Sequence, residues 1–298
     1  MSIFLAACQV RPENISPAGK ERLKVLATTT FVGDIVRNIA GDKIDLTVLL
    51  EPGQNPHSFL ASPRDMVSLT EADLLFVNGF GLEEFLDELL EGSDFPGSLV
   101  IVSEGISPRV IEVGLDEIIT SDNPGVDPHV WLNPNNIKIW VDNISGTLIK
   151  MDSGNADYYL DNSDIYLQKL EDLDIWIRAE LDSIPEENRE LVSDHSSLGY
   201  FADEYGLRQI GAVIPAMTTE AETSGQQLAD LIDTIRDQQA KAIFVGVDFD
   251  PTLAQRVSDE TGIELVVLYF GSLSDGPPAD TYLNFMRYNI ESIVNALK

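Results

Sequence analysis

The stretch "NADYYLDNSDIYLQKLEDLDIWIRAELDSI", residues 155–184, decides the fold, because it interrupts a regular alternation of predicted strands and helices. Its apolar residues recur at helical spacing. A helix of about 28 residues, at about 1.5 Å per residue, would be about 40 Å long and could brace two lobes. The apolar stripe that we expect this helix to bury consists of Tyr159, Leu160, Ile165, Leu167, Leu170, Leu173, Ile177 and Leu181.

Predicted strands and helices alternate on both sides of this stretch. Short apolar runs are separated by segments with helical periodicity. Such alternation is typical of βαβ units and of a largely parallel sheet. The sequence therefore predicts an α/β fold of two halves, joined by helix, with a cleft between them. The expected strands cover residues 23–30, 44–50, 74–79 and 98–103 in the first half and residues 190–194, 208–214, 240–246 and 263–270 in the second.

Three helix ends carry clear local signals. Gly41 follows a helical pattern and is the residue type that most readily forms a C-cap. Ser62 is a good N-cap, and Pro63 suits the first helical position after it. Asn133 and Pro134 repeat this pair of signals. We therefore expect one helix to end at Gly41 and two others to begin at Pro63 and Pro134.

The chain of 298 residues is strongly acidic. It contains 50 Asp and Glu residues against 19 Lys and Arg residues, which gives a net charge of −31. Such a surface repels nucleic acids and anionic lipid headgroups, so a nucleic-acid function is not expected. We expect most of this acidity to form a solvated surface.

The N-terminus suggests a processing signal. The single cysteine, Cys8, follows "LAA", and "LAAC" resembles the end of a bacterial lipoprotein signal, whose cysteine is acylated. An ordinary apolar N-terminus is the alternative. A single cysteine allows neither an internal disulfide nor a cysteine-based zinc site. No later run reaches the about 18 apolar residues of a membrane span, so we expect membrane contact only through a lipid at Cys8.

These features together divide the chain into four parts. The polar, proline-containing stretch after Cys8 is typical of a tether. The expected parts are residues 1–23 as signal remnant and tether, 24–150 as the N-terminal α/β lobe, 151–184 as the linking helix and 185–298 as the C-terminal α/β lobe.

All three histidines of the chain fall at the ends of predicted elements. His57 lies in a loop after a strand, His129 in a loop before a helix, and His195 at the end of a strand. Ligands of open α/β sheets bind beyond the carboxyl ends of the strands. The wide spacing of these histidines matches no local zinc motif. A shared site would therefore have to be assembled by the tertiary fold.

The loop "VDPHVWLNPNN", residues 126–136, is suited to holding a ligand. Pro128 fixes its own φ angle and restrains the residue before it. We expect Trp131 to wedge the loop against the core. His129 would then emerge from a stiff loop with its ring already positioned.

Three motifs resemble those of the metal-binding lipoproteins that serve bacterial zinc and manganese ABC importers. "PGQNPHSF" (52–59) is similar to the first-ligand loop of that family, "DPHVWLNP" (127–134) to its second and "DHSSLGYFADEYGL" (194–207) to its third. The resemblance runs from about Lys24 to the C-terminus. It implies two Rossmann-like lobes joined by a rigid helix, with a metal ion bound in the cleft between them by His57, His129 and His195.

The fourth ligand departs from the family pattern. The family supplies an Asp or Glu from the loop after the last strand of the second lobe, and that position falls at or next to Gly271. Glycine cannot coordinate through a side chain. Asp275, four residues further on, could swing in, or water could complete the shell. Asp248 and Asp250 rank behind these two.

Three imidazoles favour zinc over manganese. Neutral imidazole suits zinc, copper, nickel and iron, whereas manganese sites usually contain more carboxylate. The resemblance implies the same preference, because the third ligand of the family is commonly Glu in manganese importers and His in zinc importers. Here it is His195.

The resulting expectation is an extracytoplasmic binding protein that is not an enzyme. It would be a monomeric lipoprotein or periplasmic protein that captures a divalent ion, Zn2+ in preference to Mn2+, and delivers it to an ABC transporter permease. The alternatives are a manganese- or iron-binding member of the same family, a zinc-dependent hydrolase with three His ligands and an open water position, and an adhesin or structural lipoprotein stabilised by metal.

Overall fold

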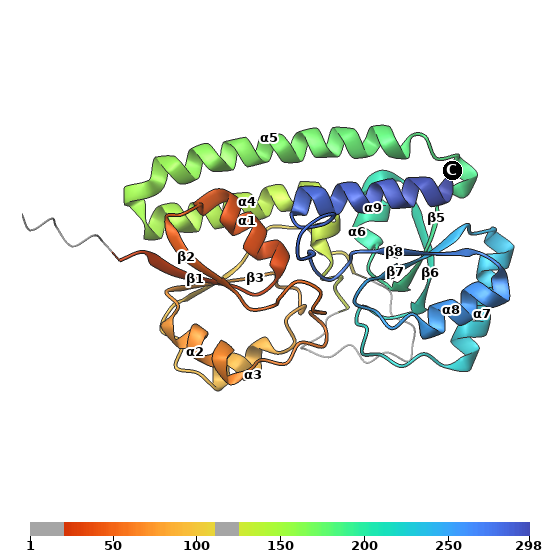
Figure 1. The fold of residues 1–298 in the computed structure, drawn as a ribbon, viewed down its shortest axis with the longest axis horizontal. Helices are drawn as coiled ribbons and strands as arrows, with labels where there is room; N and C mark the ends of the chain where they lie inside the picture. Colours follow the sequence, from red (N-terminus) through yellow and green to blue (C-terminus); the bar gives the residue numbers. More distant parts are fainter. Residues whose placement is uncertain (1–20, 111–124) are drawn as a thin grey trace, which may run out of the picture.

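The computed structural model describes residues 21–110 and 125–298 and shows two lobes, each built on a four-stranded parallel sheet (Figure 1). The expected α/β fold of two lobes joined by helix is confirmed. Cys8 and most of the expected tether lie outside the described residues. None of the helices in the described part of the chain is both long and apolar enough to cross a bilayer.

The first sheet has the strand order β2-β1-β3-β4, and all its neighbouring strands are parallel. The strands β1 and β3 are central. All of β3 and the last three residues of β1 are buried, as expected for apolar runs in a parallel sheet covered on both faces. The elements of this lobe are β1 (Leu23–Ala27), α1 (Thr30–Ala40), β2 (Ile44–Val48), α2 (Pro63–Glu71), β3 (Leu74–Val77), α3 (Leu86–Glu91) and β4 (Ser98–Ile101).

The second sheet repeats this arrangement with the order β6-β5-β7-β8, again all parallel. In both sheets, the first strand lies between the second and the third, so the two lobes share one topology. The elements of this lobe are β5 (Glu190–His195), α6 (Gly199–Tyr205), β6 (Arg208–Ile214), α7 (Gly225–Gln238), β7 (Ala242–Gly246), α8 (Thr252–Thr261), β8 (Glu264–Leu268) and α9 (Tyr282–Leu297).

The local signals at the helix ends act as expected. Gly41 caps α1 with a φ of 54°. Ser62 forms a reciprocal capping box with Asp65 at the start of α2. Asn133 accepts a hydrogen bond from the backbone N–H of Asn135 at the start of α4.

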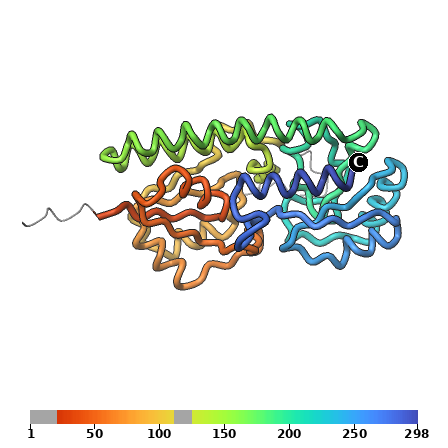
Figure 2. The backbone as a smooth tube through the Cα atoms, turned by 45° about the horizontal axis from the view of Figure 1, so that its top comes forward, coloured from red at the N-terminus to blue at the C-terminus, as the bar shows by residue number. Residues whose placement is uncertain are grey.

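The chain between the lobes is helical. It consists of the short 3-10 helices η1 (Val130–Leu132) and η2 (Ser153–Asn155) and of α4 (Pro134–Met151) and α5 (Ala156–Leu181). The 26 residues of α5 make it about 39 Å long. Figures 1 and 2 show α5 running along both lobes, and it packs against α1 of the first lobe and α9 of the second.

The face that α5 buries differs in part from the expected stripe. Leu160 and Ile165 are 51% and 55% exposed, so their prediction as buried residues was wrong. Leu167 is half-buried and packs against the main hydrophobic cluster. Ser163 and Tyr166 are buried instead. At about 100° per residue, Leu160 and Ile165 point away from the narrow face that packs. The other expected residues are buried: Tyr159, Leu170, Leu173, Ile177 and Leu181.

A single large hydrophobic cluster connects the two lobes. It includes Phe31 and Val32 of α1, Phe244 of β7 and Phe285 of α9, together with the inner faces of α4 and α5. Each lobe has a smaller second cluster under its outer helices. The lobes therefore share one core along the side that α5 covers.

Candidate metal centre

His195 is the last residue of β5, so its side chain emerges at the C-terminal edge of the second sheet. The Asp194 Oδ1 atom lies 2.7 Å from His195 Nδ1 and accepts the His195 backbone N–H at 2.6 Å. The Asp194 Oδ2 atom accepts the backbone N–H of Gly246, at the end of β7, at 2.6 Å. One buried carboxylate thus fixes the ring of His195 to the neighbouring strand.

His129 follows Pro128 and precedes η1. The Asp127 Oδ1 atom lies 2.8 Å from His129 Nδ1 and accepts the His129 backbone N–H at 3.0 Å. Both residues are almost completely buried. A carboxylate therefore orients this ring in the same way as that of His195.

Trp131 anchors the loop that carries His129. Its ring is 1% exposed and stacks on Phe31 of α1, with 5.2 Å between the ring centroids. Its Nε1–H donates to the backbone oxygen of Phe270, which follows β8, at 3.0 Å. The expected wedge is confirmed, and it joins the two lobes directly beside the histidines.

His57 is held in a different way. It lies in the loop after β2, and its backbone N–H donates to Asn55 Oδ1 at 2.9 Å. Asn55 in turn donates to Thr219 Oγ1 at 2.9 Å, and the N–H of Gly53 donates to Ser272 Oγ at 2.7 Å. A loop of the first lobe is therefore positioned by side chains of the second.

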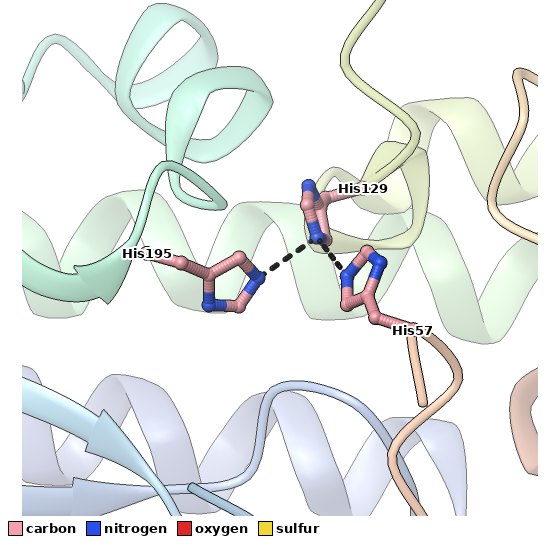
Figure 3. A group of neighbouring side chains, drawn as sticks. All are labelled: His57, His129 and His195. Carbon is pink, nitrogen blue, oxygen red and sulfur yellow. Dashed lines mark hydrogen bonds between the residues drawn. The ribbon is translucent and has the colours of Figure 1, made fainter. Parts of the chain in front are cut away.

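The three imidazoles converge on one point between the lobes (Figure 3). The distance from His129 Nε2 is 3.2 Å to His57 Nε2 and 3.0 Å to His195 Nε2. All three ligand nitrogens lie within 4.8 Å of one another. Two nitrogens bound to a tetrahedral zinc ion at about 2.0–2.1 Å would lie about 3.3–3.4 Å apart. The contacts involving His129 are close to this spacing.

Hydrogen bonding assigns the tautomers of two of these rings. Asp127 Oδ1 and Asp194 Oδ1 each accept a backbone N–H as well, so each is an acceptor, and the Nδ1 atoms of His129 and His195 carry the protons. Their Nε2 atoms then present lone pairs to each other at 3.0 Å. Two lone pairs at that distance repel, and a cation between them would turn the repulsion into coordination.

Burial keeps two of the rings neutral. It lowers the pKa of His57 and of His129 well below the ordinary value of 6.5, and the neighbouring imidazoles lower both further. Only the neutral ring can offer a lone pair to a metal ion. These rings are therefore ready to coordinate at neutral pH.

The space between the rings is small. A pocket of about 10 Å³ is lined by all three histidines and by Trp131, Asp248, Phe270 and Gly271, among others. A volume of about 10–15 Å³ holds about one water molecule. The pocket therefore suits a single ion and is too small for an organic substrate.

The carboxylates considered from the sequence lie in different places. Asp275 and Asp250 are exposed, and neither lines the pocket, whereas Asp248 and Gly271 do. Burial, together with the nearby charge of Asp194, raises the pKa of Asp248 to about 6. The supporting carboxylates Asp127 and Asp194 were missed by the sequence reasoning. Each immediately precedes "H" or "PH", a signal that could have found it.

A family model described as the zinc-uptake complex component A, periplasmic, matches residues 25–296. The chain belongs to the ZnuA family. Members of this family are metal-binding, periplasmic substrate-binding proteins of ABC transporters. The expectation of an extracytoplasmic protein in this transporter class is thereby confirmed. The members that the chain matches are solute-binding proteins and not enzymes, which excludes the hydrolase.

Individual ZnuA-family relatives differ in the metal that they are named for. The manganese-binding lipoprotein MntA of Halalkalibacterium halodurans is 30% identical over 100% of this chain and 95% of its own length. A manganese-bound periplasmic metal-binding protein of Candidatus Liberibacter asiaticus has a TM-score of 0.81 at 28% identity, covering 93% of this chain and all of its own. The periplasmic zinc-binding protein TroA of Treponema pallidum has a TM-score of 0.82 at 27% identity, covering 93% and 99%.

Proposed function

We propose that His57, His129 and His195 bind a divalent metal ion as transport cargo, zinc in preference to manganese, for delivery to an ABC transporter permease. One observation carries the proposal. The Nε2 atoms of His129 and His195 face each other at 3.0 Å while their Nδ1 protons are held by carboxylates. Two lone pairs that face each other at this distance repel, and a cation bound between them would relieve that repulsion.

The donor set supports zinc. Three neutral nitrogen donors suit a borderline-soft ion, whereas manganese is better served by carboxylate and water oxygen. The spacing of the nitrogens around His129 supports the tetrahedral geometry that zinc adopts. Manganese is the second candidate, because MntA and the Liberibacter protein are named for that metal.

The residues around the site lower the free-energy cost of binding the metal ion. The rings of His57 and His129 need not lose a proton at neutral pH, since burial already keeps them neutral. Asp127 and Asp194 hold two rings in place before the ion arrives. Little side-chain entropy is therefore lost on binding, which favours tight coordination.

Competition between metals tests the preference. Protein stripped with a chelator and dialysed would be titrated with zinc and with manganese against a chromophoric chelator of known affinity. We expect zinc to bind at least about 100-fold more tightly, because three imidazole donors favour the later metal of the Irving–Williams order. Equal affinities, or tighter binding of manganese, would contradict the preference and leave manganese as the cargo.

The metal-stripped protein can also be used to distinguish a transport function from a purely structural role of the metal. If metal merely stabilised the fold, its removal would unfold the protein. The shared core beside α5 does not depend on the histidines. We therefore expect the stripped protein to keep its far-UV circular dichroism and to rebind zinc fully. Loss of helical signal on stripping would favour the structural lipoprotein.

A further inference from the structure

A carboxylate occupies the space beside Gly271. A Cβ atom built on Gly271 would lie 2.5 Å from Asp248 Oδ2, and one built on Gly246 would lie 2.7 Å from Asp248 Oδ1. Real Cβ atoms do not approach other atoms so closely. The carboxylate of Asp248 therefore fits where it does because two glycines face it.

This carboxylate shares the small pocket with the three imidazoles. It extends from the segment after β7, next to the Gly246 N–H that Asp194 accepts. It is half-buried, and within the described ranges no other side chain donates a hydrogen bond to it. A carboxylate in such a place is costly unless it finds a positive partner.

We propose that Asp248 supplies the fourth ligand to the ion held by His57, His129 and His195, in space that Gly246 and Gly271 leave open. This inference rests on the proposed function, because it assumes that the three histidines bind the ion. The site would then combine three neutral nitrogens with one anionic oxygen. The charge of a divalent ion would be half neutralised by direct coordination.

The other acidic side chains in this region are engaged or remote. The carboxylate of Asp250 accepts hydrogen bonds from the backbone N–H and the hydroxyl of Thr252, so it caps α8. Asp275 is exposed and does not line the pocket. Asp194 uses one oxygen on His195 and the other on Gly246. Asp248 is the acidic residue of this group with a carboxylate left to coordinate.

Gly271 explains why the carboxylate comes from another segment. Its Cβ direction points at Asp248 and also at Pro56, 2.9 Å away, which precedes His57. Any side chain at position 271 would compete with Asp248 for the same space. A carboxylate introduced at position 271 would therefore enter the space that Asp248 now fills and could replace the carboxylate of Asp248 once that residue is removed.

A relocation experiment tests this inference. Zinc affinity would be measured by chelator competition for the wild-type protein, D248A and the double variant D248A/G271D. We expect D248A to lower the affinity by more than about 100-fold, since the loss of an outer-sphere partner alone costs about 10- to 100-fold. We expect D248A/G271D to recover at least half of that loss on a logarithmic scale.

Two further variants serve as comparisons, D250A as a matched acidic residue two positions away and D275A as the candidate suggested by the sequence. Both should stay within about twofold of the wild-type affinity, with unchanged circular dichroism. X-ray absorption of the zinc-loaded wild-type protein should show three imidazoles and one carboxylate. D248A should show water in place of the carboxylate.

The outcomes separate this inference from the proposed function. If H129A loses zinc but D248A binds it within about threefold of wild type, the three-histidine site stands and Asp248 is not a ligand. A loss confined to D275A would likewise overturn the inference in favour of that residue. If H129A itself binds zinc like the wild-type protein, the proposed function fails first.

Discussion

The loop that carries His57 and the end of β5 that carries His195 deliver the same side chain in different ways. His195 extends a central strand, and Asp194 ties its ring to the next strand. His57 lies on a loop, and within residues 21–110 and 125–298 no side chain is hydrogen-bonded to its Nδ1 atom. The proposed site therefore combines two rings that carboxylates hold in place, those of His129 and His195, with one ring that is held mainly by its surroundings.

This difference suggests that the three histidines have different roles in binding and in releasing the ion. A ligand fixed by a buried carboxylate favours capture, because its orientation is already correct. A ligand on a loop can leave the ion without disturbing a sheet. We infer that release begins at His57, whose loop is held to the second lobe by the side chains of Asn55 and Ser272.

The largest effects should follow from removing a ligand. We expect H57A, H129A and H195A each to lower zinc affinity by more than about 100-fold, since each removes a donor that no nearby side chain replaces. Chelator competition on stripped protein would measure this, with H129A the most severe because the His129 Nε2 atom lies within 3.2 Å of the Nε2 atoms of both other rings. If H57A bound zinc like the wild-type protein, the loop would not be part of the site.

Removing a supporting carboxylate should have the next largest effect. D127A and D194A should weaken zinc binding by about 10- to 100-fold, because the ring of His129 or His195 would lose its fixed tautomer and orientation. The same competition assay applies, with thermal unfolding recorded in parallel as a control for folding. Affinities within about twofold of wild type would show that the rings are prearranged by packing alone.

The pH dependence of the metal-free protein tests the neutral state of the rings. The pKa values of His57 and His129 lie well below 6.5, so both rings should stay neutral as the pH falls to about 6.5 and take up protons only below it. Proton competition with zinc at these two rings should then begin only below about pH 6.5. NMR titration of the imidazole signals, assigned with the single His variants, would check this. A titration step of either ring near pH 6.5 would contradict it.

The smallest effect should come from the loop contacts of His57. N55A removes the acceptor of the His57 backbone N–H and the link to Thr219, whereas T219V removes only that link. We expect N55A to speed zinc release by about two- to tenfold, the range of one or two ordinary hydrogen bonds, and T219V by less. Stopped-flow transfer of zinc to a chelator would measure both rates. Equal release rates in the wild-type protein, N55A and T219V would contradict the inference that release begins at His57.

Much of the fold could be predicted from local sequence. Cap signals at Ser62 and Asn133 and the apolar runs of the strands act within a few residues, so they can be read without tertiary contacts. The buried face of α5 was harder to predict. Apolar residues such as Leu160 and Ile165 lie around the helix, and only the packing of α1, α4 and α9 decides which of them are covered.

The candidate site also had one part that could be predicted from the sequence and one part that could not. The three histidines could be found because each lies in a recognisable motif, and the structure brings them together. The carboxylate next to them could not be ranked, because the place of Asp248 depends on two glycines, one at the end of β7 and one after β8, that face it in space. No spacing along the chain contains that information. The preference among metals likewise depends on the final donor set and remains a prediction.

The long helix α5 has a consequence for communication with the membrane. It is buried against α1 of one lobe and α9 of the other, so a large swing of the lobes would break a continuous core. We infer that an importer which distinguishes the loaded from the empty protein does so without a large closing movement of the lobes. It would recognise a local difference near the site, such as a change in the position of the loop that carries His57, and this recognition would then depend on a few contacts.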